Sequence, residues 1–181
     1  MTSAPAPERR GGTAFVLGGG GVLGAAEVGM LQALLERGIP FDVYEKSDQV
    51  GGNWVFGNKN GMSSAYRDLF INTSRERMEY SDFPMPKDFP DFPHHTHIAR
   101  YFNDYVDHFG LREKIRFETG VEHAARGDDG TWEITLEGGE THRYDALLVA
   151  NGHHWNPRWP AWARWCAPAR TCTRANRCAT C

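Results

Sequence analysis

The chain has 181 residues, 40% of them hydrophobic and 24% charged, with a formal net charge of −3. This composition is typical of a globular domain, and the small net charge argues against nucleic acid or an anionic membrane as a partner. No apolar run is long enough to span a bilayer, and the first dozen residues lack the apolar core of a signal peptide. We therefore expect a cytoplasmic protein in which residues 1–12 are a disordered lead-in.

The first predicted elements are a strand, a glycine-rich turn and a helix. A short apolar strand is expected at Thr13 to Leu17, and a helix from about Val22 to Arg37. The turn between them fits the pattern GxGxxG, with its glycines at Gly19, Gly21 and Gly24. By itself such a pattern also occurs in tight turns that bind no cofactor.

A second strand, residues 39–45, ends on the acidic residue Glu45, which follows Gly24 by 21 residues. Strand, glycine turn, helix and strand with a terminal carboxylate form the dinucleotide-binding arrangement. The carboxylate accepts hydrogen bonds from the hydroxyls of an adenosine ribose, and the glycines let a pyrophosphate approach the helix N-terminus. The pattern therefore predicts a nucleotide cofactor.

The rest of the chain alternates loops, one clear helix and short strands. Residues 47–60 and the proline-rich stretch 81–93 read as loops. Thr96 is predicted to cap an amphipathic helix that Gly110 ends. The apolar face of this helix contains Ile98, Tyr101, Phe102, Tyr105, Val106 and Phe109. Further strands are predicted at residues 115–117, 121–123, 132–136, 141–144 and 146–150, the third and fourth as a hairpin and the last as a strand buried in a parallel sheet.

Histidines and cysteines form clusters that resemble metal sites only superficially. For His94, His95 and His97, solvated or capping roles are favoured over metal binding, because no carboxylate lies at ligand spacing. All four cysteines lie in the last 16 residues, within a segment, 161–181, that contains no Leu, Ile, Val, Phe or Gly. We predict that this segment is an unstructured tail, and its composition suggests translation out of frame. A zinc site is the alternative, but only one CxxC pair is present.

Four segments carry a resemblance to a known family. They read ERGIPFDVYEKSDQVGGNW, NTSRERMEYSDFPMP, DFPHHTHIARYFNDYVDHF and YDALLVANGHHWNPRWP. From Glu36 to about Pro160 the chain resembles the N-terminal FAD-binding part of flavin-containing monooxygenases. The resemblance implies an α/β fold with a parallel sheet, a Rossmann-type FAD-binding domain at residues 13–160.

The resemblance also implies roles for individual residues. Glu45 holds the adenosine ribose, and the glycine turn faces the pyrophosphate. Gly52, Asn53 and Trp54 lie along the cofactor. Asn72 and Thr73 match a pair beside the isoalloxazine ring, and Asn72 is the implied catalytic residue, since a side-chain amide both donates and accepts hydrogen bonds there.

The activity implied by the family is oxygenation of a small amine, sulfide or ketone with FAD, NADPH and O2. The family's second glycine-rich motif, which binds NADPH, is absent from this sequence. We therefore expect a truncated chain without a second nucleotide-binding domain. A non-catalytic FAD-binding fragment is the alternative function.

A third hypothesis comes from residues 13–39, which resemble the opening of patatin-like acyl hydrolases. In those enzymes a glycine run of this kind forms an oxyanion hole. Such an enzyme also needs a nucleophilic serine in a GxSxG turn. The nearest match, residues 61–65, reads GMSSA and lacks the last glycine. The hydrolase reading therefore has no nucleophile.

Overall fold

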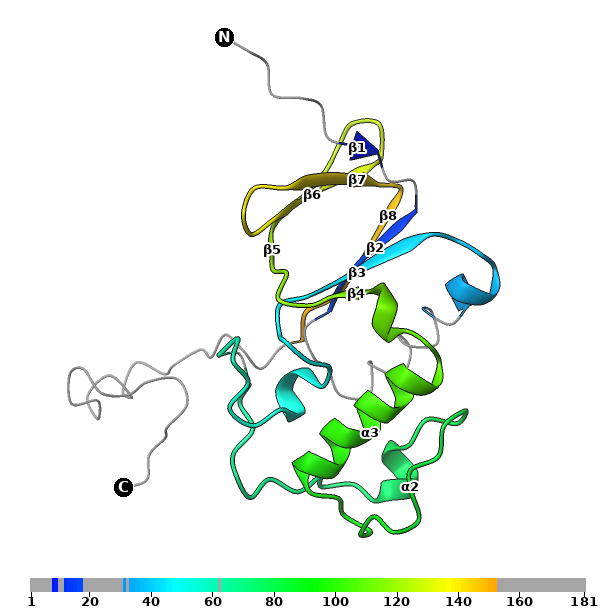
Figure 1. Ribbon diagram of the computed structural model, residues 1–181, viewed down its shortest axis with the longest axis vertical. Helices are drawn as coiled ribbons and strands as arrows, with labels where there is room; N and C mark the ends of the chain where they lie inside the picture. The colour runs from blue at the N-terminus through cyan, green and yellow to red at the C-terminus, as the bar shows by residue number, and fades with distance from the viewer. Residues whose placement is uncertain (1–7, 10–11, 18–30, 32, 62, 153–181) are drawn as a thin grey trace, which may run out of the picture.

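The computed structural model describes residues 8–9, 12–17, 31, 33–61 and 63–152, and Figure 1 shows its elements. The strands are β1 (Glu8–Arg9), β2 (Thr13–Leu17), β3 (Phe41–Glu45), β4 (Ile115–Arg116), β5 (Val121–Arg126), β6 (Trp132–Leu136), β7 (Thr141–Tyr144) and β8 (Ala146–Ala150). The helical elements are η1 (Gly52–Trp54), α2 (Arg75–Met78), α3 (His95–His108) and η2 (Arg112–Lys114). Residues 33–36 are also helical.

One sheet is parallel throughout, with the strand order β4-β3-β2-β8. Its central strand β2 pairs with β3 so that Leu17 lies opposite Glu45, and with β8 so that Leu17 lies opposite Ala150. Parallel strands need a crossover between them, and the helical residues 33–36 belong to the crossover from β2 to β3. The predicted α/β fold with a parallel sheet is confirmed.

The second sheet has the order β1-β7-β6-β5, in which β5, β6 and β7 form an antiparallel meander. The predicted hairpin is confirmed at the predicted bounds. Gly138 and Gly139 make its turn with φ angles of 108° and 89°, which other residues rarely adopt. Glu8–Arg9 pairs with β7, so the prediction of a disordered lead-in is wrong for these two residues. A strand of two residues is too short to show an alternating pattern in the sequence, so its pairing with β7 could not be predicted.

The parallel sheet is packed between α3 on one face and the antiparallel meander on the other, as the successive layers in Figure 1 show. Val43 packs in a cluster with α3, whereas its neighbour Tyr44 packs with the meander residues Ile134 and Leu136. Successive strand residues point to opposite faces, so β3 contributes to both layers. A third cluster, which includes Ile71 and Ile98, joins α3 to the long loop region between η1 and α3.

Helix α3 has the apolar face that its sequence predicts. Ile98, Tyr101, Tyr105 and Val106 are buried, and Gly110 follows the helix with φ of 62°. The predicted cap is wrong: His94, not Thr96, is the N-cap residue, and its side chain accepts a hydrogen bond from the Thr96 amide. The imidazole of His94 reaches this amide because the helix begins one residue after it.

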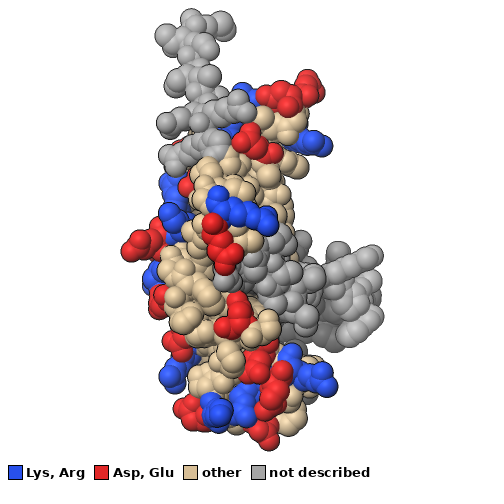
Figure 2. All heavy atoms as spheres, turned by 90° about the vertical axis from the view of Figure 1, so that its right-hand side faces the viewer, with Lys and Arg blue, Asp and Glu red and all other residues tan. Residues whose placement is uncertain are grey.

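Strand β8 departs from the fully buried strand that its sequence predicts. Ala150 is buried, but Val149 is 61% exposed. Leu147, on the same face as Val149, packs against the meander cluster, so the meander covers only the first part of that face. On the side of the molecule seen in Figure 2, positive and negative side chains are interspersed. No helix in the described part of the chain is long and apolar enough to cross a membrane.

Candidate functional site

Glu45 occupies the carboxyl end of β3, opposite Leu17, the last residue of β2. In the sequence, Leu17 is followed directly by the glycine-rich stretch that begins at Gly18. Only 5% of Glu45 is exposed, and its Oε1 accepts a hydrogen bond of 2.7 Å from the Ser47 amide. Burial raises the pKa of the Glu45 carboxyl to about 7, against the lowering effect of the backbone amides of Ser47 and Lys46.

The loop after Glu45 is held by two buried polar side chains, Ser47 and Asn58. The Ser47 hydroxyl donates to Asn58 Oδ1 at 2.8 Å, and Asn58 Nδ2 donates to the carbonyl oxygen of Gly52 at 3.3 Å. The two residues are 1% and 6% exposed. A buried pair of this kind fixes the loop because each polar group loses water and needs its partner. The pair therefore links the acid at the end of β3 to η1.

The predicted cofactor residues Gly52, Asn53 and Trp54 form η1 itself. Gly51 precedes η1 with φ of 122°, and a Cβ there would lie 3.0 Å from Val55 Cγ2. Asn53 Oδ1 accepts hydrogen bonds from the Ser64 amide at 2.8 Å and from the Ser64 hydroxyl at 2.7 Å. The amide of Asn53 can therefore act on a cofactor as a donor, through Nδ2.

Asn72 and Thr73 lie in an exposed bend that precedes α2. The residue before them, Ile71, is buried and donates a backbone hydrogen bond of 3.0 Å to the carbonyl oxygen of Pro93. The His95 amide donates to the Leu69 carbonyl at 2.9 Å. The start of α3 thus anchors the segment that carries the predicted catalytic asparagine.

The structure joins the predicted residues from Glu45 to Thr73 through a chain of contacts that the sequence did not reveal. Ser47 and Asn58 bridge Glu45 to η1, and His95 bridges η1 to the segment before Asn72. Gly19, Gly21 and Gly24 lie outside the described residues, as do His153 and His154. Nothing in the local sequence marks Ser47 or Asn58, because their partners are set by the loop's path.

The prediction of solvated or capping roles for the three histidines agrees with the structure for one of them and not for another. His94 has the capping role that its position predicts, but His95 is buried, at 4% exposure, rather than solvated. His97 is partly buried, with its ring 4.7 Å from the ring of Phe89. Among the described residues, no group of three or more His, Cys, Asp or Glu side chains is arranged to hold a metal.

A comparison with protein families shows to which family this chain belongs. The flavin-binding monooxygenase-like family matches residues 14–164, which include the glycine turn and the candidate site. The chain belongs to the flavin-binding monooxygenase-like family. Flavin-containing monooxygenase 5 of Cavia porcellus is 37% identical over 151 residues, which cover 78% of this chain and 28% of that protein. The chain therefore spans little more than a quarter of that relative's length.

Solved structures of flavin-dependent monooxygenases have the same fold. An S-allyl-L-cysteine S-oxygenase from Allium sativum superposes with a TM-score of 0.69 at 24% identity, over 83% of this chain and 38% of the other. A steroid monooxygenase bound to NADP has a TM-score of 0.67 at 22% identity, over 83% and 28% of the two chains. At these identities the likeness establishes the fold shared with other flavin-binding monooxygenase-like proteins.

Proposed function

We propose that this chain is the FAD-binding part of a flavin-dependent monooxygenase that oxygenates a small organic amine, sulfide or ketone. The overall reaction consumes the substrate, O2, NADPH and a proton. It yields the oxygenated substrate, NADP⁺ and water. Family membership supports the reaction class, and the S-oxygenase of similar fold makes a sulfide the first substrate class to test.

The observation that carries the proposal is the placement of Glu45. Its buried carboxyl ends β3 opposite Leu17, which precedes the glycine-rich stretch in the sequence, and ribose recognition requires an acid at such a strand end. A carboxylate whose pKa is raised by burial gains from hydrogen-bond donors, and the two hydroxyls of an adenosine ribose are such donors. The residues present therefore fit the adenosine end of FAD.

The other proposed contacts follow the order of the chain. Gly19, Gly21 and Gly24 approach the pyrophosphate with their backbone amides. Gly52, Asn53 and Trp54 lie along the cofactor. Asn72 and Thr73 contact the flavin ring, where the Asn72 amide donates to or accepts from the reacting end. FAD supplies the redox chemistry and O2 activation, whereas these residues bind it, orient it and exclude water.

NADPH is the proposed reductant, and a cytoplasmic location goes with it. The first 165 residues contain no cysteine, so residues 13–160, which we propose as the FAD-binding domain, need no disulfide or oxidising compartment. A non-catalytic FAD-binding fragment is the second candidate. NADPH consumption separates the two, because only the monooxygenase oxidises NADPH.

The first experiment is a visible absorption spectrum of the purified full chain after incubation with FAD and desalting. We expect a retained flavin band in the unchanged chain. Glu45→Ala should weaken FAD binding by about tenfold or more, because charge-assisted hydrogen bonds are each worth roughly 1.5–3 kcal/mol. Glu122→Ala, at an exposed position on β5, is the matched control and should bind FAD normally. Equal affinities in the two variants would remove the ribose role from Glu45.

A further inference from the structure

The imidazole of His95 lies between two backbone carbonyl groups that are distant in the sequence. Its Nδ1 is 3.2 Å from the carbonyl oxygen of Trp54, and its Nε2 is 3.1 Å from that of Arg67. A carbonyl oxygen only accepts hydrogen bonds, so a ring nitrogen of His95 bonds one of these carbonyls only when it carries a proton. The doubly protonated ring donates to both carbonyls, and the neutral ring to one of them.

The two carbonyls belong to the two segments that carry the proposed flavin contacts. Trp54 is the last residue of η1, and Arg67 begins the segment that leads to Asn72. The start of α3 holds the same segment by its backbone, through the His95 amide and the Pro93 carbonyl. One side chain therefore connects η1 to the Asn72 segment, with α3 as the rigid base.

The surroundings fix the His95 ring in place. The ring centroid lies 4.1 Å from that of His94 and 5.9 Å from that of Phe56. His94 accepts from the Thr96 amide through Nδ1 and donates to the Arg67 carbonyl through Nε2 at 2.8 Å. A carbonyl oxygen has two lone pairs, so Arg67 can accept from both histidines. A buried donor with so little freedom defines the position of the loops that it binds.

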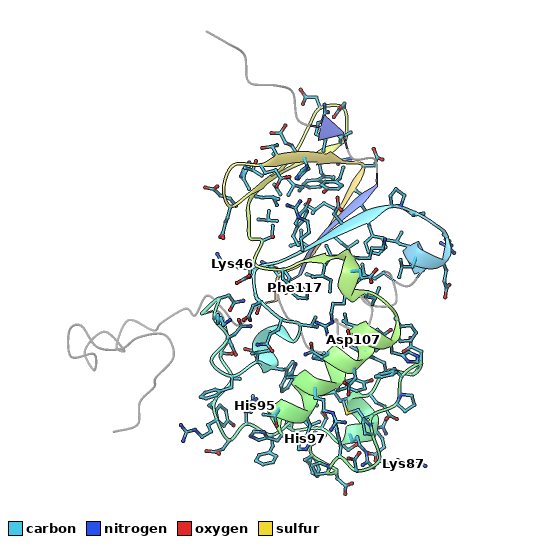
Figure 3. All side chains as sticks on the ribbon, in the orientation of Figure 1. Lys46, Lys87, His95, His97, Asp107 and Phe117 are labelled. Carbon is cyan, nitrogen blue, oxygen red and sulfur yellow. The ribbon has the colours of Figure 1, made fainter. Side chains whose placement is uncertain are left out.

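We propose that His95 is a positioning residue that holds the Gly52–Trp54 turn and the segment before Asn72 in one arrangement on the N-terminal turn of α3. The role of this arrangement in FAD binding rests on the proposed function. The hydrogen-bonding contacts of His95 are independent of that proposal. Figure 3 shows His95 and His97 at the same end of α3, with Asp107 at the opposite end.

Three variants of the full chain test the proposal. His95→Phe keeps a planar ring against His94 and Phe56 but removes both ring nitrogens, and His95→Gln restores a donor group. His97→Phe is the matched control, since this ring packs on Phe89 two residues along the same helix. The reporters are hydrogen-bonded backbone amides of the two segments. They are Trp54 and Val55 in the first, and Leu69 and Ile71, the latter bonded to the Pro93 carbonyl, in the second.

Amide hydrogen exchange in the FAD-free protein gives the first readout. We expect His95→Phe to speed exchange in both segments by about tenfold, with partial recovery in His95→Gln and little change in His97→Phe. The Leu136 amide, in the β6–β7 hairpin, should keep its wild-type rate in all three, which shows that the fold persists. Unchanged exchange in His95→Phe, or loss in only one segment, would overturn the bridging role.

FAD binding gives the second readout and keeps the two proposals apart. Where the unchanged chain binds FAD, His95→Phe should raise the Kd about tenfold and shift the absorption maxima of the bound flavin, while His97→Phe leaves both unchanged. Faster exchange with an unaltered Kd and spectrum would overturn the positioning role in cofactor binding. An unchanged chain that binds no FAD would overturn the proposed function, and the exchange rates alone would then decide the bridging role of His95.

Discussion

The Glu45 carboxylate accepts a hydrogen bond of 2.7 Å from the amide of Ser47, two residues later, at a point where Glu45 is 5% exposed. The backbone amides of Ser47 and Lys46 do not offset the loss of water around the charge, so burial raises the pKa of Glu45 to about 7. The carboxyl therefore exchanges its proton near neutral pH, so we expect both the stability of the fold and the proposed FAD binding to depend on pH in this range.

Stability should fall as pH rises through this range. The reference pKa of Glu45 is 4.5, and between this value and about 7 the folded chain keeps a proton that the unfolded chain has lost. The stabilisation is complete below pH 4.5 and is lost as pH rises to 7, at about 1.4 kcal/mol per pKa unit at most. Urea unfolding of the FAD-free chain and of Glu45→Gln at several pH values measures the effect. A difference between the two that does not vary with pH would contradict it.

FAD affinity should have the opposite pH dependence. Ribose hydroxyls donate to the ionised carboxylate, so binding lowers the pKa of Glu45 and releases a proton. We expect the affinity to rise from pH 5 to pH 7, by at most about tenfold per pH unit. Titration followed by flavin fluorescence measures the Kd. Glu45→Gln has no proton to lose, and an equal slope in this variant would assign the titration to another group.

Gly51→Ala should damage the entry to η1 more than Gly57→Ala damages its turn. Gly51 has φ of 122° and a Cβ there would lie 3.0 Å from Val55 Cγ2, whereas Gly57 has φ of 65° with open space around it. We expect costs of roughly 1–3 kcal/mol at Gly51 and about 1 kcal/mol at Gly57. Urea denaturation gives both values. Only Gly51→Ala should also weaken FAD binding, and equal Kd values would argue that η1 does not touch the cofactor.

Tyr144→Phe should loosen the contact between the two sheets. The Tyr144 hydroxyl donates to Asp42 Oδ2 at 2.6 Å and lies 2.5 Å from the hydroxyl of Tyr44. Burial, with the Asp42 carboxylate, raises the pKa of Tyr144 far above its usual value, so the hydroxyl stays protonated. We expect a loss of roughly 1–3 kcal/mol by thermal unfolding. Tyr66→Phe, at a residue 61% exposed, is the control and should change stability by less than about 0.5 kcal/mol.

Sequence patterns were enough for the elements whose signals are local. The hairpin of β6 and β7 has the predicted bounds because its strands flank Gly138 and Gly139. The buried face of α3 follows from a helical spacing of apolar residues that continues to Gly110. Both signals lie within a few residues of the structure that they specify. The family segments likewise placed Glu45 at the end of a strand.

Tertiary structure alone decided how the candidate site is joined. Ser47 and Asn58 are 11 residues apart, and His95 meets carbonyls 41 and 28 residues away. From the sequence, the histidine cluster predicts solvated or capping roles, and residues 47–60 are predicted only to be a loop. Asn58 Nδ2 and the His95 ring meet backbone oxygens, which every residue has, so no residue pattern marks these contacts. The sequence determined the strands, helix and acid of a nucleotide-binding fold. Only the packing of distant loops on α3 selected His95 as their common donor, because a buried donor must find its acceptors in space rather than along the chain.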